Sequence, residues 1–253
     1  MFSLDIEMPS DISELFIILI ELFIPMQRRK IDKIIENRKN GKSLRELVYI
    51  YFCEQMKAGR LSTGNFINQS EICTKLNISK APLRDALIQL ETEGFVTILP
   101  RKGVLINSLT LEDIAEAYEI LGTIESEAVR SSYDKIKEHH LESMELINEK
   151  LIKTLESGKF AEYYSLNIDF HNIFLNLVGN SLFLKIVTPI KQRLYDFPLR
   201  NYNIEWEREN LQDHERFIIS IRRGNREAAA NIIKYEHWSF TLHEKHIRKF
   251  YQV

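Results

Sequence analysis

Four side chains in the second half of the chain could share one metal ion. Asn167 and His171 are four residues apart, so on a helix they project from the same face, about 6 Å from each other. His214 and His237 belong to the next two predicted helices, which bring them together if the turn at 223–225 is tight. Three imidazoles and one oxygen ligand suit Zn²⁺, Ni²⁺ or another first-row divalent ion. From spacing alone, the alternative is that these are unrelated core or surface residues.

A second set of side chains is basic and lies in the first half of the chain. Between Met26 and Asn107 there are 15 lysines and arginines against 8 acidic residues. The chain as a whole has a net charge of −2, and all 7 of its histidines follow residue 138. A basic segment followed by an acidic one predicts a part that binds a polyanion and a separate part with another task.

The apolar spacing between residues 42 and 107 predicts three short helices in succession. The first follows from the periodic apolar positions that begin at Leu44. Asn68 or Ser70 can cap the second helix, and Ser79 can cap the third. The stripe that the third helix is expected to bury consists of Leu83, Ala86, Leu87 and Leu90.

Residues 95–99 and 104–106 predict a β-hairpin with a basic tip at 100–103. Three short helices and such a hairpin form a winged helix-turn-helix, whose third helix enters the major groove of DNA. We expect Arg84 to pair with guanine. The residues expected to contact phosphates or the minor groove are Ser79, Lys80, Arg101, Lys102 and Gly103. The alternative is a solvated helix face and an ordinary hairpin.

The segment from Ala58 to Ile106 resembles the N-terminal domain of the GntR family of transcriptional regulators. The positions that match the family pattern are Gly59, Leu61, Gly64, Leu76, Ile78, Ser79, Pro82, Leu83, Arg84, Asp85, Ala86, Leu87, Leu90, Glu93, Gly94, Phe95, Val96, Arg101 and Gly103. This resemblance implies that the protein binds operator DNA as a homodimer on a near-palindromic site.

From residue 109 to the C-terminus the sequence is typical of helices. Thr110 and Asp113 have the spacing of a capping box, which begins a helix that runs to about Ser132. Further helices are predicted at 136–157, 160–178, 181–198, 205–223 and 226–250. The predicted fold class is therefore mainly α, with a winged helix-turn-helix followed by an antiparallel all-helical bundle that could hold a ligand.

Two segments of this helical part, around His171 and from Asp213 to His237, resemble the FCD domain, the effector domain of FadR-type GntR regulators. Members of this group often bind a divalent metal ion through one aspartate and three histidines, and the metal helps to hold a small carboxylate. Carried over residue by residue, the resemblance implies that the ligands here are Asn167, His171, His214 and His237.

Two positions depart from the FCD pattern. Asn167 replaces the aspartate, so the ligand is a weaker neutral oxygen and the site is one charge more positive; Asp169 points away from that face and is no substitute. Leu121 stands where many relatives carry an arginine that holds the effector carboxylate, so the effector need not be an ordinary hydroxy acid. The candidates for contact with it, each with a structural or exposed role as the alternative, are Tyr118, Tyr164 and Arg193.

The first 25 residues include an apolar stretch at 15–24 that is too short to span a bilayer and lacks the basic start of a secretory signal. It has three interpretations: a helix covering an apolar patch on the body or on a second copy, a shallow membrane-contacting helix, or a translated leader before a start at Met26. Two cysteines, Cys53 and Cys73, are too few for a disulfide scaffold. We expect a cytoplasmic protein without stable membrane association.

These patterns predict three parts: an N-terminal extension of unknown role (1–41), a DNA-binding domain (42–107) and an effector-binding and dimerisation domain (108–253). The function predicted is that of a transcription regulator whose operator affinity a small organic acid controls, with Zn or Ni as cofactor. One alternative is a metal-dependent enzyme with an appended DNA-binding domain, although no His-Glu-x-x-His arrangement is present. Another is a regulator whose bundle only dimerises. The histidines expected to be exposed to solvent are His139, His140, His243 and His246.

Overall fold

The computed structural model describes residues 43–196 and 203–253. The apolar stretch at 15–24, with its three interpretations, lies outside the described residues. Within the part of the chain that is described, we find no helix with the length and apolar character that crossing a membrane would need.

Two compact units can be distinguished within the described residues. One joins residues 43–52 to Asn68–Gln89, and the other joins Cys53–Ile67 to Leu90–Val253. The larger unit contains the helical part of the protein, in which the three candidate histidine ligands lie.

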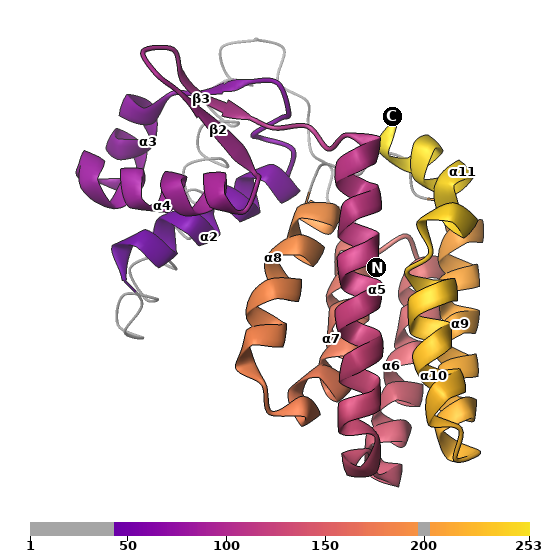
Figure 1. Cartoon of the computed structure of the whole chain (residues 1–253). Coiled ribbons are helices and arrows are strands. Elements are labelled where there is room, and N and C mark those ends of the chain that lie inside the picture. The colour runs from indigo at the N-terminus through magenta and orange to yellow at the C-terminus, as the bar shows by residue number, and fades with distance from the viewer. Residues whose placement is uncertain (1–42, 197–202) are drawn as a thin grey trace, which may run out of the picture. The chain divides into compact units, whose positions relative to one another are not determined.

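Three helices open the described chain, as the apolar spacing predicted: α2 (Leu44–Lys57), α3 (Gln69–Leu76) and α4 (Lys80–Thr92) (Figure 1). Asn68 caps α3, because its side chain accepts a hydrogen bond from the Glu71 N–H at 3.1 Å. Asn77 ends this helix in the left-handed conformation, with φ of 50°. The predicted stripe of α4 is confirmed, since at most 2% of each side chain is exposed at Leu83, Ala86, Leu87 and Leu90.

A small antiparallel sheet with the strand order β1-β3-β2 is made of β1 (Phe66–Ile67), β2 (Val96–Leu99) and β3 (Gly103–Ile106). The predicted hairpin is confirmed by its register, in which Val96 pairs with Ile106 and Leu99 with Gly103. Strand β1 was not predicted from the sequence, because two residues are too few to show an alternating pattern.

The helical part confirms a mainly α fold. Its elements are α5 (Leu111–Ser132), the 3₁₀ turn η1 (Tyr133–Lys135), α6 (Glu138–Glu156), α7 (Phe160–Val178), α8 (Ser181–Asp196), α9 (Ile204–Arg222), α10 (Arg226–Ile232), the π-helical turn η2 (Ile233–His237) and α11 (Phe240–Tyr251). Helix α5 packs against α7, α8, α10 and η2, and α6 packs against α7 and α9 (Figure 1). The capping box at Thr110 and Asp113 is present.

The prediction of one continuous helix over 226–250 is wrong. The backbone N–H of Trp238 donates to the carbonyl oxygen of Ile233, five residues earlier, at 3.0 Å, which makes the wider turn of a π-helix. Ser239 then starts a new helix, because its side chain accepts a hydrogen bond from the backbone of the first turn of α11. This break determines where His237 lies.

Candidate metal centre and nucleic-acid interface

Helix α4 separates its apolar residues from its charged ones. The residues of its outer face, Lys80, Ala81, Arg84 and Asp85, are exposed, and so is Ser79 just before the helix. Because the opposite stripe is buried, the charged face is left open to a ligand. The first N–H groups of any helix have no partner within the helix, which makes this end suitable for an anion.

The tip of the β2–β3 hairpin is a tight turn that carries two cations. The Lys102 N–H donates to the Leu99 carbonyl oxygen at 3.1 Å. Arg101 has φ of 62° and Gly103 has φ of 113°, a region that glycine adopts without strain. Since Arg101 and Lys102 are exposed, their charges remain available to an anionic partner.

Three imidazoles from three different elements meet inside the helical part. His171 on α7, His214 on α9 and His237 on η2 each place one ring nitrogen so that all three atoms lie within 4.8 Å of one another. At most 5% of each residue is exposed. We call these three residues the imidazole cluster. The structure thus brings together the three histidines that the spacing singled out.

A buried carboxylate orients the first member of the imidazole cluster. Glu125 Oε2 accepts hydrogen bonds from His171 Nδ1 at 2.7 Å and from Trp238 Nε1 at 2.8 Å. Its other oxygen forms an ion pair with Lys191 of α8, which is 2% exposed. Burial acts to raise the pKa of Glu125, but Lys191 and His171 lower it below its usual range. Because Glu125 is an ionised acceptor, the proton of His171 resides on Nδ1.

Asn148 orients the second member of the imidazole cluster, His214. His214 Nδ1 lies 3.1 Å from Asn148 Oδ1, while Asn148 Nδ2 donates to the Leu211 carbonyl oxygen at 3.4 Å. The amide nitrogen therefore faces the backbone, and the amide oxygen accepts from His214. On its other side the His214 ring stacks on Phe170, with centroids 3.8 Å apart.

The remaining ring nitrogens have the chemistry that a metal ion requires. Nε2 of His171 and Nε2 of His214 are buried and have no hydrogen-bond partner among the described residues. Burial lowers the pKa of His171 to about 3 and that of His214 well below its usual value. Both rings are therefore neutral, the form in which imidazole binds metals. A divalent ion fits these residues, because it would satisfy nitrogens that are otherwise costly to bury.

Asn167 supplies an oxygen beside the imidazole cluster. Its side chain is one helical turn before His171 and is 6% exposed. Its Nδ2 donates to the Tyr195 hydroxyl at 3.1 Å, and its Oδ1 is buried without a hydrogen-bond partner in the described chain. Asp169 is exposed, in agreement with the expectation that it points away.

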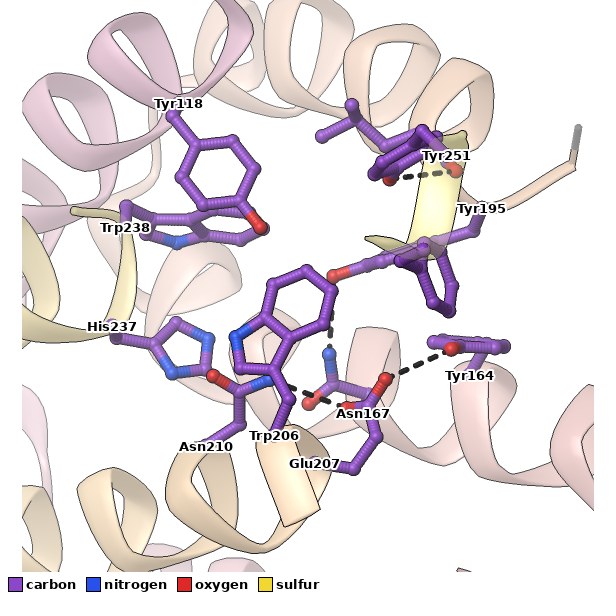
Figure 2. A pocket seen from close by; sticks show the side chains of 12 residues that line it. Tyr118, Tyr164, Asn167, Tyr195, Trp206, Glu207, Asn210, His237, Trp238 and Tyr251 are labelled. Atoms are coloured by element: carbon purple, nitrogen blue, oxygen red, sulfur yellow. Dashed lines mark hydrogen bonds between the residues drawn. The ribbon is translucent and has the colours of Figure 1, made fainter. Parts of the chain in front are cut away.

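A cavity of about 30 Å³ adjoins the imidazole cluster, because His237 and Asn167 both line it (Figure 2). Its walls are mainly aromatic and come from α5, α7, α8, α9 and the last helical segments. Its lining side chains include Tyr118, Tyr164, Tyr195, Trp206, Glu207 and Trp238. We call it the aromatic cavity.

Of the three candidates for contact with an effector, the structure places two on the aromatic cavity and one elsewhere. Tyr118 and Tyr164 line it. Arg193 instead forms an ion pair with Asp113, at 2.8 Å between Nη2 and Oδ1, and lines a second cavity of about 120 Å³. Arg193 therefore lies away from the aromatic cavity, because its guanidinium is paired with Asp113, the acidic residue of the capping box of α5.

Sequence reasoning missed four polar residues of this region, which are Asn148, Lys191, Tyr195 and Glu207. The sequence feature that could have identified two of them is a polar residue within the apolar stripe of a predicted helix. Asn148 falls between Met144 and Leu151 on α6, and Lys191 between Val187 and Leu194 on α8, all of which are buried. A polar side chain at such a position must find a partner inside.

The expectation of exposure is wrong for His243 and confirmed for His139. His243 is 5% exposed, and its Nε2 lies 2.9 Å from the Glu236 carbonyl oxygen. His140 and His246 are partly covered. The break before α11 explains the error at His243, because it turns the buried face of this helix relative to a continuous one.

Two models of protein families match the chain. Residues 44–106 match the bacterial regulatory proteins of the gntR family, and residues 116–237 match the FCD domain. The chain therefore belongs to the GntR family of transcriptional regulators and has the FCD type of C-terminal domain. It is a DNA-binding transcription regulator.

Curated relatives agree with this assignment. An uncharacterised HTH-type transcriptional regulator, YdhC of Bacillus subtilis, is 26% identical over 205 residues, which are 79% of this chain and 92% of that protein. The Nta operon transcriptional regulator of Aminobacter aminovorans is 28% identical over 177 residues, 68% of this chain and 81% of that one. These relatives are regulators and not enzymes, as was expected of this chain.

Solved structures support the fold. McbR/YncC of E. coli is 17% identical, with a TM-score of 0.66, and the match covers 82% of this chain and 99% of that one. A putative GntR regulator from Rhodococcus sp. RHA1 is 18% identical, with a TM-score of 0.63, over 76% and 93% of the two chains.

Proposed function

We propose that this regulator binds a divalent metal ion in the imidazole cluster and that a small carboxylate effector, bound beside the metal, controls its affinity for operator DNA. The observation that carries the proposal is the convergence of three buried imidazoles, with ring nitrogens within 4.8 Å of one another. His171, His214 and His237 would hold the ion, and Asn167 Oδ1 would be the fourth ligand. The ion is Zn²⁺ or Ni²⁺, both of which accept imidazole ligands.

Charge supports an anionic effector. Imidazole binds metals in its neutral form, so three such ligands and an amide would leave the whole charge of a divalent ion uncompensated by its own ligands. When bound, the ion supplies a Lewis-acidic centre for a ligand oxygen. The protein's part is to keep the rings in place, which Glu125 does for His171 and Asn148 for His214.

The proposed DNA contacts come from two exposed segments. Arg84 on α4 would read guanine, while Ser79 and Lys80 hold phosphates at the start of the helix. At the hairpin tip, Arg101 and Lys102 would follow the backbone or the minor groove, and Gly103 allows the turn. The protein would act as a homodimer, in which the effector changes operator affinity by its preference for one arrangement of the two DNA-binding domains.

Elemental analysis of protein purified without a His-tag tests the metal site. We expect near-stoichiometric metal in the wild type and its loss in the double variant His171→Ala/His214→Ala. The matched control is His139→Ala/His140→Ala, which also removes two histidines but leaves the imidazole cluster intact. Metal that is retained by the first double variant would show that it binds elsewhere.

A second measurement separates this proposal from a regulator whose bundle only dimerises. Thermal unfolding of the full chain should show a higher Tm with Zn²⁺ or Ni²⁺ than after chelation, because an ion that binds only the folded state stabilises it. This difference should vanish in His171→Ala/His214→Ala. A wild-type Tm that is indifferent to metal and chelator would favour the purely dimerising bundle.

A further inference from the structure

The aromatic cavity contains a carboxylate whose hydrogen-bond donors are all neutral. Glu207 Oε1 accepts from the Tyr164 hydroxyl at 2.8 Å, and Oε2 accepts from the Tyr163 hydroxyl at 2.9 Å and from Asn210 Nδ2 at 3.2 Å. The residue is 5% exposed. Figure 2 shows it on the same cavity as Asn167 and His237.

This carboxylate lacks a counter-ion in the described chain. No ion pair joins Glu207 to any described lysine, arginine or histidine, and no lysine or arginine is among the described residues that line the aromatic cavity. Glu125 is the instructive contrast, since Lys191 neutralises it. Burial raises the pKa of Glu207, although the hydrogen bonds from Tyr164 and Tyr163 and the nearby His237 act to lower it. A raised pKa is the direction expected of a buried carboxyl group that no lysine or arginine neutralises.

The walls around Glu207 suit a cation as well. The rings of Tyr164 and Tyr195 stack with centroids 5.0 Å apart, and those of Tyr118 and Trp238 meet edge to face at 5.2 Å. Aromatic faces attract ammonium groups, and the attraction increases when water is excluded. An effector carrying carboxylates alone would place negative charge near Glu207 with no described lysine or arginine on the lining to offset it.

We propose that the aromatic cavity binds the protonated amine of a small ligand, with Glu207 as its counter-ion. This inference rests on the proposed function, because it describes the second end of the same effector, whose carboxylate would bind at the metal. The effector is then an amino carboxylate and not a simple hydroxy acid. A volume of about 30 Å³ accommodates a group of the size of one ammonium, since a water molecule needs about 10–15 Å³ by the same measure.

Matched pairs of ligands test the proposal. Alanine and lactate share a carbon skeleton and differ in an ammonium against a hydroxyl group, as do aspartate and malate. Isothermal titration calorimetry would use the full-length protein loaded with Zn²⁺ and dialysed free of excess metal. We expect an amino acid to bind at least about tenfold more tightly than its hydroxy counterpart, since a hydrogen bond between charged groups contributes more than a neutral one.

Variants then assign the preference to one residue. Glu207→Gln keeps the size and a hydrogen-bonding amide, so it should abolish the preference for the ammonium group. Glu215→Gln, an exposed change on the same helix, should preserve it. If Glu207→Gln does not fold, the wild-type comparison decides alone: equal binding of both members of each pair, or no binding of alanine and aspartate at millimolar concentration, overturns the proposal.

The outcomes also separate this inference from the proposed function. Metal-dependent binding of lactate or malate without any preference for amines would overturn the inference and leave the metal site and its carboxylate effector intact. Amine binding that persists in His171→Ala/His214→Ala and disappears in Glu207→Gln would support the amine site while removing the metal from the effector's recognition.

Discussion

The exposed face of α4 and the imidazole cluster both consist of nitrogen-bearing side chains, but their surroundings differ completely. Lys80 and Arg84 extend into solvent from a helix whose opposite stripe is buried. His171 and His214 are fully buried, and each is held by an acceptor from another helix. The charged side chains of α4 stay hydrated until a polyanion binds. The imidazole cluster is buried in the folded chain and depends on hydrogen-bond partners that are distant in the sequence.

This difference predicts where a substitution affects folding and where it affects binding alone. A charge in water costs the fold little, so its loss should be visible only when the partner is present. A buried charge or imidazole requires its partner at all times, since unpaired burial is expensive. Three substitutions, in order of decreasing effect, examine this contrast.

The largest effect on stability is expected from Lys191→Met. The change removes the cation of the buried pair and leaves the charge of Glu125 inside the bundle with only His171 and Trp238 as partners. Breaking such a pair typically costs about 3–5 kcal/mol, so the urea midpoint should fall markedly. Lys185→Met on the same helix is the control, because Lys185 is exposed and its loss should change the free energy of unfolding by less than about 0.5 kcal/mol. Equal effects of the two changes would contradict the assignment.

Arg84→Ala should weaken DNA binding and leave the stability of the fold unchanged. Its side chain is exposed, so we expect unchanged unfolding but an operator affinity reduced by about 1–3 kcal/mol, roughly 5- to 150-fold, with relaxed base preference. Fluorescence anisotropy at fixed salt would measure this on a duplex selected by the wild type from random sequence. Lys245→Ala on α11 removes the same charge from an exposed position in the bundle and serves as the control. Equal affinity of Arg84→Ala and wild type would refute the role in base contact.

Sequence periodicity was sufficient for the exposed surface and insufficient for the buried one. A helix face repeats locally, so the buried stripe of α4, the cap at Asn68 and the exposure of Arg84 all followed from residues a few positions apart. The same reasoning selected the three histidines but treated the segment that carries His237 as an unbroken helix. A π-turn has no clear signature in sequence, because it differs from an α-helix by one displaced hydrogen bond.

The partners of the buried site were harder to predict for a related reason. Asn148 and His214 are separated by 66 positions, and Tyr164 and Glu207 by 43. Which polar residue on one stripe meets which on another depends on how the helices pack. Arg193 is an example. It is basic and lies on α8, which also contributes to the aromatic cavity, but its guanidinium forms an ion pair with Asp113 of α5.

The smallest effect concerns the slope of stability against pH and follows from Glu207. Because burial raises the pKa of Glu207, the folded chain holds this proton more tightly than the unfolded chain does. The resulting stabilisation is complete below the ordinary value of 4.5 and is lost as pH rises through the raised one. Glu207→Gln has no such contribution. The free energy of unfolding of the wild type minus that of Glu207→Gln should therefore fall as pH rises from 4.5.

Urea unfolding of metal-free protein at several pH values measures this difference, from which the titration of groups that do not interact with Glu207 cancels because both chains share it. Glu215→Gln, whose carboxyl group is exposed on the same helix, should show no comparable slope against the wild type. A difference that rises with pH would mean that Glu207 has a cationic partner in the folded chain. The aromatic cavity would then resemble the neutralised pair at Glu125, and an ammonium ligand would have no unmatched charge to bind.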